Sequence, residues 1–135
     1  MVANLISVPP QKVDPHPWGE MAWLLSDADR AMMGLSLARM TVKPGARCGA
    51  HRHSNAAETV FVSAGSIDIR MRLIRLRLTV GEHQVIPEGA AHELMNLGDD
   101  IAQLMIVYSH PARAYEATSW IEEKRRARTS PPLKS

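Results

Sequence analysis

Apolar and polar residues alternate with a period of two in the middle of the chain. One set of apolar residues has one parity and the next set has the other: Ile67, Ile69, Met71 and Leu73, then Ile74, Leu76, Leu78 and Val80. A period of two predicts strands that bury one face. Because the parity changes between Leu73 and Ile74, we expect a hairpin there, although no Gly or Asn marks its turn.

Turn residues divide the rest of the chain into further short segments. Strands are expected over residues 34–42, 51–53, 59–63 and 101–108, with another short apolar segment over 21–25. The expected turns lie at Lys43-Pro44-Gly45, Ala64-Gly65, Gly81, Pro87-Glu88-Gly89 and Asn96-Leu97-Gly98-Asp99. Short strands separated by turns every 8–12 residues or so are typical of an all-β sandwich or barrel.

The ends of the chain lack this pattern. Residues 1–13 contain Pro9 and Pro10 and are expected to form an extended N-terminal arm, followed by a β-barrel over 14–111. Residues 26–29 are expected to form a turn or an abortive helix start. A short helix is expected over 112–128, and residues 129–135 are expected to form a flexible tail.

Composition narrows the class of protein. A length of 135 residues, 45% of them hydrophobic, favours one globular domain, and a net charge of +2 does not favour nucleic acid or a membrane as partner. Cys48 is the only cysteine, so no intramolecular disulfide is expected. The sequence has neither a signal peptide pattern nor the apolar run of roughly 20 residues that a membrane span needs, and we expect a cytoplasmic protein.

Three histidines and one glutamate form a candidate metal site. His51 and His53 are two residues apart, so on a strand both side chains project from the same face. Glu58 follows five residues later, and His92 comes 34 residues after it, beyond two more expected strands. Three imidazoles and one carboxylate suit Mn, Fe, Co, Ni or Zn and are a poor match for Ca or Mg.

These four residues lie within two motifs of fixed spacing. The first is Gly45, five residues, His51-Arg52-His53, four residues, Glu58, six residues and Gly65. The second is Gly81, five residues, Pro87-Glu88-Gly89, two residues, His92, three residues and Asn96. All ten fixed positions resemble the two motifs of the cupin family, and with Gly and Pro at only about 7% and 5% of residues, chance agreement is negligible.

The resemblance implies a double-stranded β-helix, a jelly-roll barrel that holds one metal ion inside. The ligands carried over from the motifs are His51, His53, Glu58 and His92, the metal being Fe, Mn, Ni or Zn, and Glu58 is also the candidate catalytic base. The sequence departs from the family pattern at Leu73-Ile74, where the hairpin usually has Gly, and at Glu82, where Asp is frequent.

Residues outside the motifs give weaker signals. Four residues on strands expected to reach the barrel interior are candidates for the substrate pocket: Arg39, Gln103, Met105 and Tyr108. Cys48 is three residues from His51, an odd offset that turns it away from the metal face in a regular strand, so a packed thiol is expected. His16, His83 and His110 occupy no ligand position and are expected to be surface or hydrogen-bonded residues.

The resemblance leaves several functions open. We favour a metal-dependent enzyme acting on a small oxyanionic metabolite, with a dioxygenase slightly preferred over an isomerase, decarboxylase or lyase by analogy of fold. Val60 stands where one lyase branch, which cleaves dimethylsulfoniopropionate, has a tyrosine. The alternatives are a non-catalytic module that binds a sugar or carboxylate through the metal, and a purely structural barrel. Pairing through edge strands predicts a homodimer.

Overall fold

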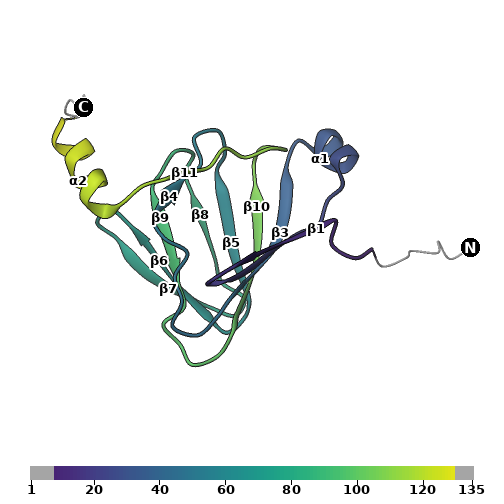
Figure 1. The fold of residues 1–135 in the computed structure, drawn as a ribbon, viewed down its shortest axis with the longest axis horizontal. Coiled ribbons are helices and arrows are strands. Elements are labelled where there is room, and N and C mark those ends of the chain that lie inside the picture. The colour runs from purple at the N-terminus through teal and green to yellow at the C-terminus, as the bar shows by residue number, and fades with distance from the viewer. Residues whose placement is uncertain (1–7, 130–135) are drawn as a thin grey trace, which may run out of the picture.

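A computed structural model describes residues 8–129 of the chain. These residues fold into two antiparallel β-sheets that face each other (Figure 1). The first sheet has six strands, in the order β1 (Lys12–His16), β2 (Gly19–Trp23), β3 (Ser36–Val42), β10 (Ala102–Tyr108), β5 (Glu58–Ala64) and β8 (His83–Ile86). The second has five, in the order β11 (Glu116–Ala117), β4 (His51–Arg52), β9 (His92–Met95), β6 (Ser66–Met71) and β7 (Arg75–Thr79). The all-β jelly-roll prediction is confirmed.

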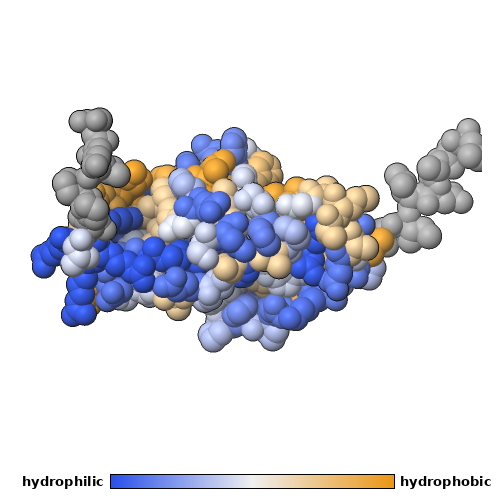
Figure 2. All heavy atoms as spheres, turned by 90° about the horizontal axis from the view of Figure 1, so that it is seen from above, coloured by the Kyte–Doolittle hydropathy of each residue, from blue (hydrophilic) through white to orange (hydrophobic). Residues whose placement is uncertain are grey.

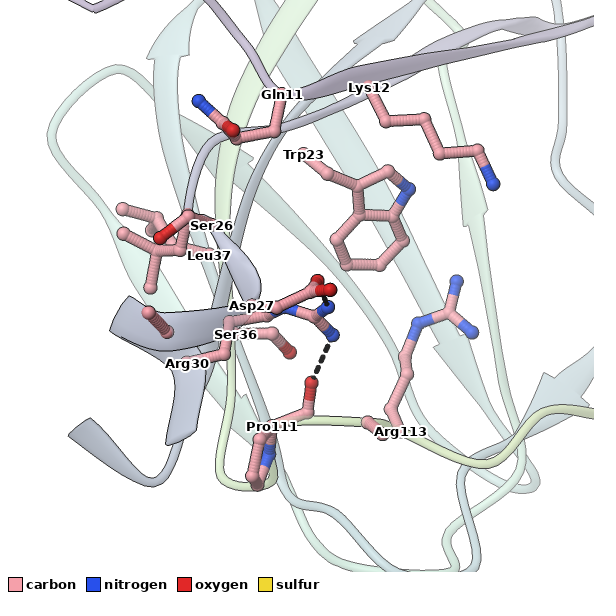
Figure 3. A pocket seen from close by; sticks show the side chains of 13 residues that line it. Gln11, Lys12, Trp23, Ser26, Asp27, Arg30, Ser36, Leu37, Pro111 and Arg113 are labelled. Carbon is pink, nitrogen blue, oxygen red and sulfur yellow. Dashed lines mark hydrogen bonds and ion pairs between the residues drawn. The ribbon is translucent and has the colours of Figure 1, made fainter. Parts of the chain in front are cut away.

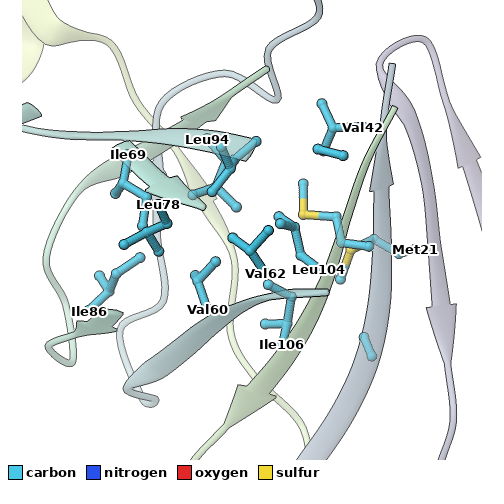
Figure 4. Packing of buried hydrophobic residues seen from close by; sticks show 14 of the residues in the cluster. Met21, Val42, Val60, Val62, Ile69, Leu78, Ile86, Leu94, Leu104 and Ile106 are labelled. Atoms are coloured by element: carbon cyan, nitrogen blue, oxygen red, sulfur yellow. The ribbon is translucent and has the colours of Figure 1, made fainter. Parts of the chain in front are cut away.

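The hydrophobic core lies between the two sheets. Strands β3 and β10 pair along their full length and bury every second residue. Figure 4 shows Val60, Val62 and Leu104 of the first sheet packed toward residues of the second sheet, with all of these side chains buried. The second sheet contributes Ile67, Ile69, Leu78 and Leu94. Burial of these aliphatic side chains is what holds the two sheets together.

The hairpin predicted between residues 67 and 80 is present as β6 and β7. Ser66 pairs with Thr79 and Arg70 with Arg75, and Met71 donates a hydrogen bond from its backbone N–H to the carbonyl of Ile74 at 2.8 Å. A glycine is needed instead at the preceding turn. Gly65 has a φ of 73°, and a Cβ there would lie 2.6 Å from the carbonyl oxygen of Ile101.

Two segments differ from the sequence prediction. Residues 26–29, expected to form a turn or an abortive helix start, begin a full helix, α1 (Asp27–Met33). Ser26 caps its N-terminus and accepts a hydrogen bond from the N–H of Asp29 at 3.1 Å. The C-terminal helix α2 (Trp120–Thr129) begins eight residues later than expected, and the residues before it are extended. Strand β1 takes up the end of the expected N-terminal arm; residues 1–7 and 130–135 lie outside the described residues.

The extended C-terminal segment, residues 112–119, crosses one end of the two sheets before α2 (Figure 1). Viewed from this end, much of the surface around α2 is hydrophilic, although an apolar patch is also visible there (Figure 2). Three basic residues of α2 are exposed, Lys124, Arg125 and Arg128, and so is the apolar Ile121. None of the described helices is long and apolar enough to cross a membrane.

Candidate metal site

The sheet that carries β4 and β9, together with the start of β5, brings the four motif residues together. His51 of β4 pairs directly with His92 of β9, His53 follows β4, and Glu58 opens β5. One ligand atom from each of these residues lies within 4.8 Å of the other three, and all four side chains are buried. The predicted ligands are therefore close enough to share one ion.

The backbone orients all three imidazoles. Their Nδ1 atoms each lie 2.9 Å from a carbonyl oxygen, of Gly49 for His51, Ala114 for His53 and Ala90 for His92. Because a carbonyl only accepts hydrogen bonds, Nδ1 carries the hydrogen and the lone pair of the neutral ring is on Nε2. Such a backbone contact is the usual outer partner of a histidine that binds a metal.

The Nε2 atoms of His53 and His92 face the carboxylate of Glu58. His53 Nε2 lies 3.2 Å from Glu58 Oε1, and His92 Nε2 lies 3.4 Å from Glu58 Oε2. Both Nε2 atoms and Glu58 Oε2 are buried without a hydrogen-bond partner. Since a lone pair on nitrogen then faces a carboxylate oxygen, a cation has to lie between them, either a proton or a metal ion. The donor set fits a transition metal.

The pKa shifts at His51 and Glu58 favour the protonation states that a metal requires. At His92 burial alone would lower the pKa, but the nearby carboxylate of Glu58 outweighs it and raises that pKa. Burial, followed by the neighbouring His92, lowers the pKa of His51 to about 4, so this imidazole is neutral at pH 7. Burial alone would raise the pKa of Glu58, but the adjacent imidazoles of His53 and His92 outweigh it and hold that pKa below its usual range. A neutral imidazole and an ionised carboxylate are the forms that bind metal.

A cavity of about 290 Å³ opens beside the cluster. Both His51 and Glu58 line it, and the remaining walls are largely apolar or aromatic: Trp18, Met21, Trp23, Met40, Leu94, Tyr108 and Tyr115, with Asp14, His16, Cys48 and Arg113. Apolar walls with a few convergent polar groups are typical of small-molecule sites. This volume accommodates a small metabolite.

The structure brings one of the four pocket candidates to this cavity. Tyr108 lines it and lies edge-on to His53, with ring centroids 5.0 Å apart. Arg39, Gln103 and Met105 do not line this cavity. The strands that carry them bury the residues of even number, so these three side chains lie on the opposite face of the sheet.

The expectation that Cys48 turns away from the metal site is wrong. Cys48 lines the cavity together with His51. Gly49, with a φ of 83°, interrupts the extended backbone between them, so the parity argument does not apply. The Cys48 thiol accepts a hydrogen bond from the N–H of Leu94 at 3.3 Å. Burial raises its pKa to about 12, which keeps the thiol protonated and packed, as predicted.

The C-terminal segment supplies two cavity residues that the sequence analysis missed. Tyr115 stacks on His51 with ring centroids 5.0 Å apart, and the Arg113 guanidinium lies 4.9 Å from the centroid of Tyr108. The sequence does contain a signal that residues 113 and 115 precede the helix. Ser119 stands three residues before Glu122, a capping pattern that predicts a helix beginning at residue 120. Its hydroxyl accepts a hydrogen bond from the N–H of Glu122 at 3.1 Å.

The end of this segment is fastened to β4. Arg52, next to two of the predicted ligands, forms a largely buried ion pair with Glu123 of α2. Thr118 donates a hydrogen bond from its hydroxyl to the same carboxylate at 2.7 Å, and its N–H donates to the carbonyl of Ala50 at 3.0 Å. The segment that carries Arg113, Ala114 and Tyr115 is thereby held over the cluster.

Comparison with known proteins gives the family. The family model described as Cupin domain matches residues 38–108, just over half of the chain. The chain belongs to the cupin family. The match spans β3 to β10 and includes all four residues of the candidate metal site.

Related sequences come from a Streptomyces species and from plants. It is 28% identical to protein SchB of Streptomyces halstedii over 98 residues, 73% of this chain and 69% of SchB. It is 37% identical to nectarin-1 of Nicotiana plumbaginifolia over 71 residues, 49% of this chain and 31% of nectarin-1. Germin-like protein 1-1 of Oryza sativa is 28% identical over 90 residues, 63% of this chain and 42% of the relative. The chain therefore spans less than half the length of this germin-like relative.

Solved structures support the same fold. A recombinant oxalate oxidase in complex with glycolate superposes with a TM-score of 0.70 at 23% identity, covering 83% of this cupin and 62% of the oxidase. Oxalate decarboxylase from Bacillus subtilis at pH 4.6 superposes with a TM-score of 0.72 at 19% identity, covering 88% of this cupin and 34% of the decarboxylase. At these identities the likeness concerns the fold alone.

Proposed function

We propose that this cupin is a metal-dependent enzyme that acts on a small oxyanionic metabolite, with His51, His53, Glu58 and His92 as the metal ligands. The observation that carries the proposal is the orientation of the three imidazoles. Each is fixed through Nδ1 by a backbone carbonyl, so that Nε2 is left for a cation shared with Glu58. A divalent metal bound there supplies Lewis-acid chemistry toward a substrate oxygen or, as Fe(II), activation of O₂.

The cavity supports a small anionic substrate. Its volume of about 290 Å³ equals that of roughly ten water molecules, which limits the ligand to a small molecule, and Arg113 contributes a positive charge to its wall. Burial, with the neighbouring carboxylate of Glu58, raises the pKa of Tyr108 well above its ordinary value, so its hydroxyl remains a proton donor. A structurally similar oxalate oxidase is described in complex with glycolate, which is a small oxyanion.

Turnover by the metal-loaded protein is the test of this proposal. Protein loaded separately with Fe(II), Mn(II), Ni(II) or Zn(II) would be incubated with small hydroxy acids, oxo acids, diketones and thiols, while NMR follows the substrate and an electrode follows O₂. We expect metal-dependent consumption of at least one compound, with O₂ uptake the first readout because a dioxygenase is slightly preferred. Absence of turnover together with a tightly bound, unreacted ligand would favour the non-catalytic binding module instead.

The assembly and the location in the cell are proposals as well. We propose a cytoplasmic homodimer formed through an edge strand, since the ends of both sheets leave unpaired backbone groups. Light scattering on the purified protein is expected to give twice the mass of one chain, which is 14.9 kDa. A monomeric mass would contradict the dimer and leave the metal site unaffected.

A further inference from the structure

Arg113 lies in the wall between two cavities. It lines the cavity beside the cluster, and it also lines an outer cavity of about 720 Å³ that includes Arg30, Ser36 and Pro111. Figure 3 shows the side chains of Arg113 and Trp23 on one side of this outer cavity. Trp23 is the other residue that borders both spaces. A ligand in either cavity therefore meets the Arg113 side chain.

The Arg113 guanidinium has aromatic neighbours and no acidic partner. It lies 5.0 Å from the ring centroid of Trp23, 4.9 Å from that of Tyr108 and 5.6 Å from that of Tyr115. Across residues 8–129 no carboxylate forms an ion pair with it, and its buried Nε has no hydrogen-bond partner. By contrast, Arg52 is paired with Glu123. A part-buried cation held by these rings and by the Tyr108 hydroxyl, with no ion pair to a carboxylate of residues 8–129, retains N–H donors that can bind an anion.

The same rings connect Arg113 with the cluster. Tyr108 touches the ring of His53, and Tyr115 stacks on His51, each with centroids 5.0 Å apart. The guanidinium is thus one aromatic ring away from two of the proposed ligands. With a divalent ion, three neutral imidazoles, the negative charges of Glu58 and Asp14 and the positive charge of Arg113, the region carries a net charge of about +1, which favours an anionic ligand.

We propose that Arg113 is the residue that selects the substrate, by binding a carboxylate at the end of the molecule that faces away from the cluster. This inference rests on the proposed function, because the other end of the ligand is taken to reach the metal site. A guanidinium offers two parallel N–H donors, which match both oxygens of a carboxylate. The preferred ligands are therefore short molecules with two oxyanionic ends, such as dicarboxylates or oxo acids.

Binding measurements on the full chain loaded with Zn(II), which is redox-inactive, test this inference without any assay of turnover. The probes are malonate, succinate and glutarate, which differ in the span between their carboxylates, and acetate, which has one. We expect calorimetry to show that the wild type binds the best dicarboxylate at least about 10-fold more tightly than acetate. Arg113→Met should reduce that ratio to near one, since a charge-assisted pair contributes about 10-fold or more.

Control variants separate recognition from general effects of charge and folding. Arg72→Met removes an equal charge from an exposed turn and should keep the full preference. Arg113→Lys keeps the charge without the planar fork and should retain part of it. Two results would overturn the inference. One is an Arg113→Met variant that keeps the full preference for a dicarboxylate. The other is a wild type that binds acetate as tightly as every dicarboxylate, and this result is decisive even if the Arg113 variants do not fold. Failure to bind Zn(II) at all would instead count against the proposed function.

Discussion

His92→Ala is expected to lower the affinity for a divalent transition metal by about 100-fold or more. Protein sites with four ligands bind zinc with roughly 10–16 kcal/mol, so one ligand contributes roughly 3 kcal/mol. His92 is among the most deeply buried of the four residues, and its Nε2 has no hydrogen-bond partner among residues 8–129. Competition titration of Zn(II) or Mn(II) against a chelator of known affinity measures the change.

His83→Ala is the matched control for this experiment. His83 lies on β8 with its side chain exposed and outside the cluster, so the same chemical change should leave the affinity within about twofold. Equal losses in the two variants would indicate a general effect on folding. If His92→Ala and His83→Ala both kept the metal affinity of the wild type, His92 would not be a ligand.

Asn96→Ala is expected to destabilise the fold by about 3 kcal/mol, from three hydrogen bonds at roughly 1 kcal/mol each. Asn96 is fully buried after β9, and its Nδ2 donates to the carbonyls of Val42 at 3.0 Å and Asp100 at 2.8 Å. Its Oδ1 accepts from the N–H of Gly98 at 3.0 Å. The side chain thus joins the end of β3 to the turn before β10, and urea unfolding measures its loss.

Asn55→Ala provides the comparison for Asn96→Ala. Asn55 also makes two hydrogen bonds to the backbone. Its Nδ2 donates to the carbonyl of Ala112 at 3.1 Å, and its Oδ1 accepts from the N–H of Ala114 at 2.7 Å. Because the first of these bonds is exposed, water can replace it when the side chain is removed. We expect it to cost about 1 kcal/mol or less. Comparable free energies of unfolding for the two variants would contradict the structural role given to Asn96.

The sequence was sufficient for the strands and for the four clustered residues, because both depend on local spacing. The hairpin between β6 and β7 follows from the change of parity at Leu73 and Ile74. His51 and His53 share a face because they are two residues apart, and the cupin motifs placed Glu58 and His92 beside them. These features need no knowledge of how distant strands pair.

The pocket could not be predicted in the same way, because it depends on register and on long-range contacts. A shift of one residue decides whether Tyr108 or Met105 faces the interior, and only the pairing of β10 with β3 and β5 fixes this. Arg113 reaches the cavity because a segment expected to be helical is extended across the end of the barrel. Cys48 reaches it because Gly49 breaks the regular strand.

Metal content by elemental mass spectrometry tests the central claim most directly. The protein would be purified without an affinity tag, alongside a His51→Ala/His92→Ala double variant that removes two residues of the cluster. We expect near-stoichiometric Fe, Mn, Ni or Zn in the wild type and almost none in the double variant. No metal in the wild type even after reconstitution, or equal metal in both proteins, would contradict the account.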